Sequence, residues 1–280
     1  MGIVLHPIGG LANRLKNLAS GLHLADDLGC EVSRVVWRVD NDVHASFTDL
    51  FKPVSVGEMV SPAWWVYNLK YAIPRKQNLY IPQVYQRLRF GHVFSDASNL
   101  FPLLDDHEEM RRLASGCLES GKDMYFISGQ EFYDFPDSLL RRLFDPVDCI
   151  ADEVARVAES FNPHTVGVHI RRTDHRLATK SSPDEVFIDA MNERISAHDD
   201  ANFYLATDDE AVKEKFIHLF PGRIITTSNP VTRRTLAGMR DAVKEMALLA
   251  STSLIIASYG STFSHLASRI GGCGYRPLTV

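Results

Sequence analysis

Residues 165–174 read TVGVHIRRTD, and this stretch decides how the whole sequence is interpreted. Its apolar first half predicts a buried β-strand. Because side chains alternate between the two faces of a strand, His169 and Arg171 should lie on one face and their apolar neighbours on the other. Ligands of open α/β sheets bind beyond the carboxyl ends of the strands, where Arg172 and Asp174 follow. Since a guanidinium donates two parallel hydrogen bonds to phosphate, the stretch predicts an anion site, with a surface ion pair as the simpler alternative.

Strand and helix patterns alternate regularly from about residue 150 to residue 270. Helices are expected over residues 150–160, 184–197, 210–220, 236–250 and 262–270, and strands over 165–170, 203–206, 224–226 and 253–257. Such alternation is typical of a parallel, doubly wound sheet. A strand over residues 3–5, a Gly9-Gly10 turn and an amphipathic helix open the chain in the same way. The sequence therefore predicts an α/β protein with two Rossmann-like domains, over residues 1–150 and 151–280.

Polar residues follow two further strands of the predicted C-terminal sheet. They are Asp208 and Asp209 after residues 203–206, and Ser261, Thr262 and Phe263 after residues 253–257. Because the carboxyl ends of parallel strands meet at one edge of a sheet, these side chains should converge with Arg171. A helix N-terminus binds phosphate through its free N–H groups, although Ser261 or Thr262 serves equally well as a simple N-cap. Thr207 and Glu210 have the spacing of a capping box for the helix that follows.

The segment His169-x-Arg171-Arg172-x-Asp174 resembles the arginine motif of the fucosyltransferase superfamily, which includes α1,2- and α1,6-fucosyltransferases and protein O-fucosyltransferases. Residues 203–209 and 254–264 resemble the second and third blocks of that family, in the expected order. Residues 9–15 resemble its N-terminal loop. The resemblance covers the C-terminal half well and the N-terminal half thinly. It implies a GT-B architecture and an inverting, metal-independent transfer of L-fucose from GDP-fucose to an acceptor hydroxyl.

The resemblance also implies roles for individual residues. Arg171 is expected to meet the negative charge that develops on the β-phosphate, with Arg172 as a second phosphate or carboxylate partner. Asp174 is expected to buttress the arginines, and either Asp208 or Asp209 to contact the guanosine. The remaining donor-binding candidates are Gly10 and Asn13 in the glycine turn, His169, Ser261, Thr262 and Phe263. A plain turn and a hydrogen-bonded core histidine are the structural alternatives. No cofactor or metal is implied besides the donor substrate.

Net charge, cysteine spacing and the length of apolar runs limit the expected binding partners and the expected cellular compartment. The 280 residues carry a net charge of −5 and a pI near 6.1, so no overall field favours nucleic acid or an anionic membrane. The four cysteines show no C-x-x-C spacing, and neither a signal peptide nor an apolar run of about 18 residues occurs. Eukaryotic Golgi relatives carry an anchor and a stem, so a bacterial, cytoplasmic enzyme or a shortened chain is expected. Its acceptor would be a glycan, a lipid-linked glycan or a peptide, and nothing in the sequence indicates an oligomeric state.

Three other functions are compatible with the sequence. Asp40-Asn41-Asp42 matches the Asp-x-Asp of metal-dependent GT-A glycosyltransferases, although a solvated loop is the simpler explanation. A GT-B enzyme could instead use another sugar nucleotide. A non-catalytic nucleotide-sugar-binding protein also fits, because residues 175–180 lack the glutamate that some relatives carry after the arginine motif. The proline- and aromatic-rich residues 51–105, expected to be irregular, would serve as an acceptor surface or as a lid.

Overall fold

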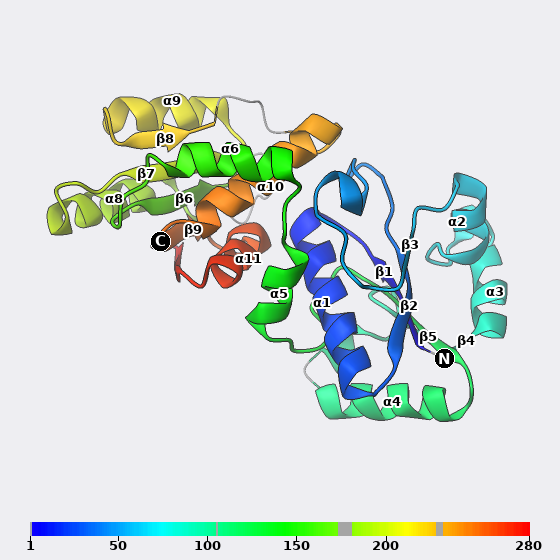
Figure 1. Ribbon diagram of the computed structural model, residues 1–280. Coiled ribbons are helices and arrows are strands. Elements are labelled where there is room, and N and C mark those ends of the chain that lie inside the picture. The colour runs from blue at the N-terminus through cyan, green and yellow to red at the C-terminus, as the bar shows by residue number, and fades with distance from the viewer. Residues whose placement is uncertain (1, 105, 173–180, 228–231) are drawn as a thin grey trace. The chain divides into compact units, whose positions relative to one another are not determined.

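The computed structural model describes residues 2–104, 106–172, 181–227 and 232–280, which form two compact α/β units (Figure 1). The first unit comprises Met1–Thr48 and Pro53–Phe144, and the second comprises Asp49–Lys52 and Asp145–Val280. Within the described residues, each unit contains one sheet of five strands, all paired in parallel. The predicted α/β class with two parallel, Rossmann-like sheets is therefore confirmed. No helix in these described ranges has the length and apolar character needed to cross a bilayer.

The sheet of the first unit has the strand order β3-β2-β1-β5-β4. Its elements are β1 (Gly2–Pro7), α1 (Leu11–Asp27), β2 (Glu31–Val36), β3 (Glu58–Val60), α2 (Trp64–Lys70), α3 (Ile81–Arg89), β4 (Phe90–Ser95), α4 (His107–Glu119), β5 (Asp123–Ser128) and α5 (Asp137–Leu143). β1 and β5 are buried along their entire length, as expected for the mostly apolar central strands of a parallel sheet. The turn that leaves β1 needs glycine, because Gly9 has a φ of +78°.

The expectation that residues 51–105 are irregular is wrong, because α2, α3 and β4 lie within them. Proline does not prevent this: Pro82 lies in the first turn of α3, where its missing N–H has no helical partner to lose. The aromatic residues instead build a core. Tyr67, Tyr71 and Phe90 pack with Tyr125 of β5 in one buried cluster. These aromatic residues of the segment are therefore ordinary core residues of a Rossmann-like unit.

The sheet of the second unit has the strand order β10-β9-β6-β7-β8. Its elements are α6 (Asp148–Ala158), β6 (Val166–Ile170), α8 (Asp184–Ala197), β7 (Phe203–Thr207), α9 (Glu210–Leu219), β8 (Ile224–Thr226), α10 (Leu236–Ala250), β9 (Leu254–Ser258), α11 (Thr262–Gly271) and β10 (Gly274–Leu278). β6 is the first strand of the unit and lies between β7 and β9, so the strand order reverses at the β6–β9 pair. In a doubly wound sheet this switch point is where a ligand site is expected.

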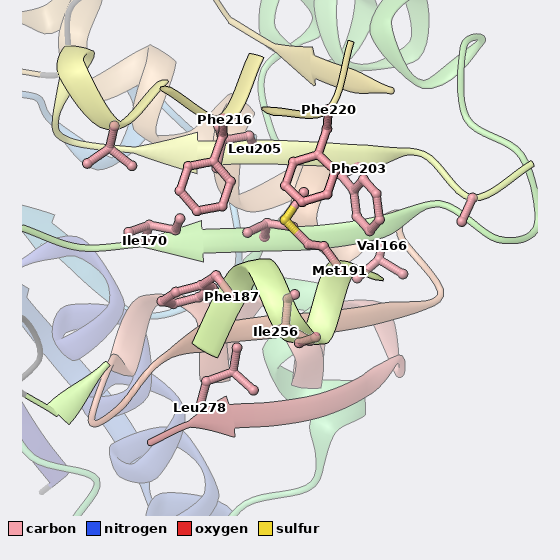
Figure 2. Close-up of a cluster of buried hydrophobic side chains, with 14 residues drawn as sticks. Val166, Ile170, Phe187, Met191, Phe203, Leu205, Phe216, Phe220, Ile256 and Leu278 are labelled. Carbon is pink, nitrogen blue, oxygen red and sulfur yellow. The ribbon is translucent and has the colours of Figure 1, made fainter. Parts of the chain in front are cut away.

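The two faces of β6 meet different layers of the second unit. The apolar side chains of β6 pack with Phe187 and Met191 of α8 and Phe216 of α9 in the cluster that Figure 2 shows. Gly167 lies on the opposite face, since a Cβ there would come within 2.9 Å of Leu249 of α10. His169, two residues further along the strand, shares that face. Strand alternation thus separates the apolar core side from the side that carries the polar motif residues.

The predicted capping box at the start of α9 is wrong. The first residue of α9 is Glu210, so the N-cap is Asp209, whose Oδ1 accepts from the N–H groups of Ala211 and Val212 at 2.9 and 3.3 Å. Thr207 still belongs to β7, and its hydroxyl accepts from the N–H of Asp209 at 3.3 Å. An aspartate is as good an N-cap as threonine, and the strand extends far enough to place it there.

Candidate functional site

A pocket lies in the second unit at the carboxyl ends of β6 and β7. Four of the residues predicted from the sequence line it, namely His169, Arg171, Asp208 and Phe263, together with Thr207, Thr232, Arg233, Gly238, Ala242 and Glu245. The backbone N–H of Arg171 donates to Ser258 Oγ at 3.0 Å, which joins the ends of β6 and β9 directly. The convergence expected from a parallel sheet is therefore present at the topological switch point.

His169 is held neutral at the wall of this pocket. Burial, and then the positive charge of Arg171, lower the pKa of His169 to about 4. Its Nδ1 lies 3.2 Å from Ser261 Oγ, and its ring centroid lies 5.3 Å from that of Phe263. Ser261 Oγ accepts the N–H of Ser264, so its hydroxyl proton can be donated to His169 Nδ1. In the tautomer that accepts from Ser261 at Nδ1, the neutral ring carries its proton on Nε2, which makes that atom a hydrogen-bond donor.

The two arginines of the motif have different surroundings. Arg171 lines the pocket, whereas the guanidinium of Arg172 makes an ion pair with Asp184, at 2.6 Å between Nη2 and Oδ1. The other carboxylate oxygen of Asp184 accepts from Lys215 Nζ at 2.7 Å. Although burial opposes its ionisation, the hydrogen bonds from Lys215 and Arg172 lower the pKa of Asp184. Arg172 is thus anchored to the first turn of α8, while Arg171 reaches the pocket.

Asp208 and Asp209, which the sequence leaves equivalent, are distinguished by the fold. Asp208 lines the pocket, and its Oδ1 accepts the backbone N–H of Arg172 at 2.7 Å. Asp209 uses its carboxylate as the N-cap of α9. The strand ends of β6 and β7 are therefore tied together by Asp208, next to the two arginines.

Glu245 of α10 is a pocket residue that sequence reasoning missed. It is 9% exposed, and its Oε1 accepts from Thr227 Oγ1 at 3.3 Å. Burial raises the pKa of Glu245 to about 7. A signal was available in the sequence, because Glu245 lies in register with Ala242 and Leu249 at the i, i+3 and i+7 spacing of a helix face. A carboxyl on an otherwise apolar stripe is unusual enough to mark a binding site.

The N-terminus of α11 contributes one exposed hydroxyl. Ser261 is buried and caps the helix, so its hydroxyl is used within the fold. Thr262, the first residue of α11, is exposed. Free N–H groups and a partial positive charge at this end favour an anion. Of the two candidates for a phosphate contact, Thr262 is the one whose side chain is exposed to solvent.

Gly10 and Asn13 belong to the first unit. Gly10 is the N-cap of α1 and has no side chain to offer, and Asn13 is half-buried. The amide Nδ2 of Asn13 lies 3.8 Å from the point that a Cβ on Gly129 would occupy, at the carboxyl end of β5. Both residues therefore lie beside the strand ends of their own sheet. Asp174, the last residue of the arginine motif, lies outside the described residues.

Asp40 has a structural partner. Its Oδ1 makes an ion pair of 2.7 Å with Arg14 Nη2, and it accepts from the N–H groups of Asp42 and Val43 at 3.0 and 3.2 Å. Arg14, whose side chain is 1% exposed, also donates to the carbonyl oxygens of Gly9 and Arg38. In the described part of the chain, no group of three or more His, Cys, Asp and Glu residues is placed to hold a metal ion.

Solved structures of fucosyltransferases share this fold. The chain aligns with NodZ α1,6-fucosyltransferase soaked with GDP-fucose at a TM-score of 0.62 and 18% identity, over 96% of this chain and 92% of that one. NodZ from Bradyrhizobium gives 0.60 and 19%, over 95% and 92%. POFUT1 in complex with GDP-fucose gives 0.56 and 14%, over 99% and 97%. No protein-family model matches the chain, and no curated protein matches it. The chain therefore has the GT-B-like fold of these fucosyltransferases, in agreement with the superfamily that its motifs resemble.

Proposed function

We propose that this protein is an inverting, metal-independent glycosyltransferase that moves L-fucose from GDP-β-L-fucose to an acceptor hydroxyl. The observation that carries the proposal is the pocket at the carboxyl ends of β6 and β7, which His169, Arg171 and Glu245 line together. A fold shared with NodZ soaked with GDP-fucose and with POFUT1 in complex with GDP-fucose supports the choice of donor. The proposal concerns the second unit first, because every residue that lines this pocket belongs to it.

Glu245 and His169 suit a guanine base. Guanine presents an N1–H and an N2–H₂ group side by side, and one carboxylate can accept from both. The Nε2–H of neutral His169 can donate to a guanine acceptor such as O6 or N7. Phe263 adds an aromatic ring beside them, 5.3 Å from the histidine ring. Adenine and uracil lack the paired donors, so this wall of the pocket selects guanine.

Arg171 suits the diphosphate. As the bond between C1 of fucose and the β-phosphate oxygen breaks, its electron pair moves onto GDP, and the acceptor oxygen forms a bond to C1 from the opposite face. The acceptor hydroxyl gives its proton to solvent water in the same process, so that the products are the fucoside, GDP and one released proton. A guanidinium that meets the growing charge lowers the barrier, and losing one such donor commonly costs about 10²- to 10³-fold in rate. Arg172 supports it by holding the end of β6 against α8 through Asp184. Thr262 and the N-terminus of α11 supply further donors to phosphate.

Nucleotide titration tests the donor. In calorimetry with EDTA, GDP should bind more tightly than IDP, which lacks the N2 amino group, by about 10- to 100-fold, because a hydrogen bond to a charged group contributes about 1.5–3 kcal/mol. ADP and UDP should bind more weakly still. Equal affinity for all four nucleotides, or binding that appears only with Mn²⁺, would contradict the proposal.

Product analysis tests the reaction. With water as a slow acceptor, the first fucose released from the β-linked donor should be the α-anomer, which NMR distinguishes before mutarotation. The β-anomer as first product would exclude inversion. GDP binding with no release of fucose to water, glycans or glycopeptides would favour the non-catalytic binding protein instead.

A further inference from the structure

The first unit carries an exposed apolar surface, and none of its residues lines the pocket of the second unit. We propose that this surface docks onto a lipid bilayer that contains anionic headgroups. We call it the α2–α3 face, and its exposed apolar residues are Trp64, Trp65, Leu69, Leu79, Tyr80, Ile81, Val84 and Leu88. It lies within one unit, and its test needs no nucleotide, so it is independent of the proposed donor site.

α3 exposes three aliphatic side chains to solvent and buries a polar one, which is unusual for a surface helix. Ile81, Val84 and Leu88 recur at i, i+3 and i+7 on one side of the helix and are exposed, with Leu88 at 77%. Gln86 is instead 2% exposed, and its Nε2 donates to the carbonyl oxygens of Lys70 and Ala72 at 3.2 and 3.0 Å. A helix that buries its amide and presents its aliphatic side chains to water is typical of a surface that is covered in use.

α2 packs against α3 and adds aromatic residues (Figure 1). Trp64 is 76% exposed and Trp65 is 66% exposed, whereas Tyr67 of the same helix points into the core. The loop before α3 adds two more exposed apolar side chains, those of Leu79 and Tyr80. Their φ values of 51° and 56° are strained for residues other than glycine. The fold therefore maintains an unfavourable backbone that presents further apolar side chains.

The charge of this segment identifies the kind of surface that it fits. Residues 59–95 contain five basic residues and no acidic one, in a chain whose net charge is −5. Arg75, Lys76 and Arg87 are exposed, while Arg89 is partly engaged by Asp123 at 2.6 Å. Tryptophan and tyrosine favour the headgroup region of a bilayer, and basic side chains beside them contact anionic lipids. A sugar ring needs hydrogen-bonding partners, which the aliphatic side chains of this face cannot provide. The same side chains fit the region of a bilayer where the headgroups meet the acyl chains.

Vesicle binding tests the proposal on the intact chain. The protein should co-sediment at least tenfold better with phosphatidylcholine vesicles that contain about 30% phosphatidylglycerol than with pure phosphatidylcholine, because each basic residue near an anionic surface strengthens binding about fivefold. The difference should shrink as salt rises. Tryptophan emission should shift to the blue and be quenched by brominated lipid. Trp37 is 1% exposed, so any change reports Trp64 and Trp65.

Two variants distinguish binding through the α2–α3 face from non-specific adsorption of the protein to vesicles. Leu88→Glu and Arg87→Glu should each weaken vesicle binding about tenfold or more, since the first places a charge among lipids and the second reverses one. Ile217→Glu is the matched control: it makes the same kind of change at a 44% exposed apolar residue of α9, and it should leave vesicle binding unchanged. Circular dichroism verifies that each variant is folded.

Three results would overturn the proposal. They are equal binding to both kinds of vesicle, equal loss in Leu88→Glu and Ile217→Glu, and no vesicle binding by the wild-type protein. In the last case, a change of tryptophan emission on addition of a soluble oligosaccharide would assign the α2–α3 face to carbohydrate instead.

Discussion

Replacing Glu245 with glutamine should stabilise the second unit at pH 8 and weaken its binding of GDP. Burial raises the pKa of Glu245 from 4.5 to about 7. Between pH 4.5 and pH 7, the folded protein keeps a proton on this carboxyl that the unfolded chain has lost. The free energy of unfolding therefore falls as the pH rises from 4.5 towards 7. At about 1.36 kcal/mol per pH unit, the full loss is about 3 kcal/mol above pH 7. Glutamine has no charge to bury and keeps an oxygen that can accept from Thr227.

The assay must report the second unit. All three tryptophans, Trp37, Trp64 and Trp65, lie in the first unit, so their fluorescence is a poor probe of α10. Native-state hydrogen exchange of peptides from β6 and β7 measures the opening of the sheet on which α10 packs. At pH 8 the variant should be more protected than the wild type by about 2–3 kcal/mol, and at pH 5 by less than about 1 kcal/mol, because the wild-type carboxyl is then protonated.

Binding should change in the opposite direction. If guanine donates to the ionised carboxylate, GDP affinity of the wild type should rise about tenfold from pH 6 to pH 8, since a group with a pKa near 7 must lose its proton first. The Gln variant should lose this pH dependence and most of the preference for GDP over IDP. Glu214→Gln, the same change at an exposed residue of α9, is the control for both measurements. A Gln variant that is less stable than the wild type at pH 8, or that binds GDP unchanged, would refute the reasoning about this carboxyl.

Two further substitutions test the arginines. Arg171→Lys keeps the charge but loses the bidentate fork, so kcat/KM for GDP-fucose should fall by about 10² or more while circular dichroism stays unchanged; activity within a few fold of the wild type would remove Arg171 from the mechanism. Asp40→Asn leaves the buried guanidinium of Arg14 without its ionic partner and should reduce the free energy of unfolding by about 2 kcal/mol, less than a fully buried pair because Asp40 is 26% exposed. Urea unfolding followed by Trp37, whose ring lies 5.4 Å from the Arg14 guanidinium carbon, measures this loss, and stabilisation of the wild type by Mn²⁺ would point to a metal role for Asp40 instead.

Local patterns in the sequence were enough to predict most elements of the second unit. The helices expected over residues 184–197 and 236–250 have those bounds in the structure, as α8 and α10, and the strand over 224–226 is β8. Periodicity succeeds here because each helix has one buried side and the central strands are mostly apolar. The same patterns indicate a parallel sheet, and a parallel sheet brings the ends of β6, β7 and β9 to one edge. The meeting of Arg171, Asp208 and the start of α11 therefore follows from the sequence.

Other features depended on contacts between residues far apart in the chain. Asp208 and Asp209 are equivalent in the sequence, and only the end of β7 decides that one lines the pocket and the other caps α9. Arg172 is a neighbour of Arg171, yet its side chain is held by Asp184 of another helix. Hydrogen bonds and ion pairs of this kind are set by how helices pack on the sheet, which no local pattern specifies.

The burial of individual side chains is the clearest example of a feature that local sequence patterns do not predict. The sequence names a glutamate at position 245 and aliphatic residues at 84 and 88, and ordinary expectation places the first in water and the others in the core. The tertiary structure reverses both assignments: Glu245 is 9% exposed and Leu88 is 77% exposed. Solvent exposure depends on what covers a side chain, and the covering residues come from elements elsewhere in the chain. The sequence by itself therefore determined most strands and helices of the second unit and the arginine motif. The tertiary structure decided which ionisable side chain is buried and which apolar side chains are exposed.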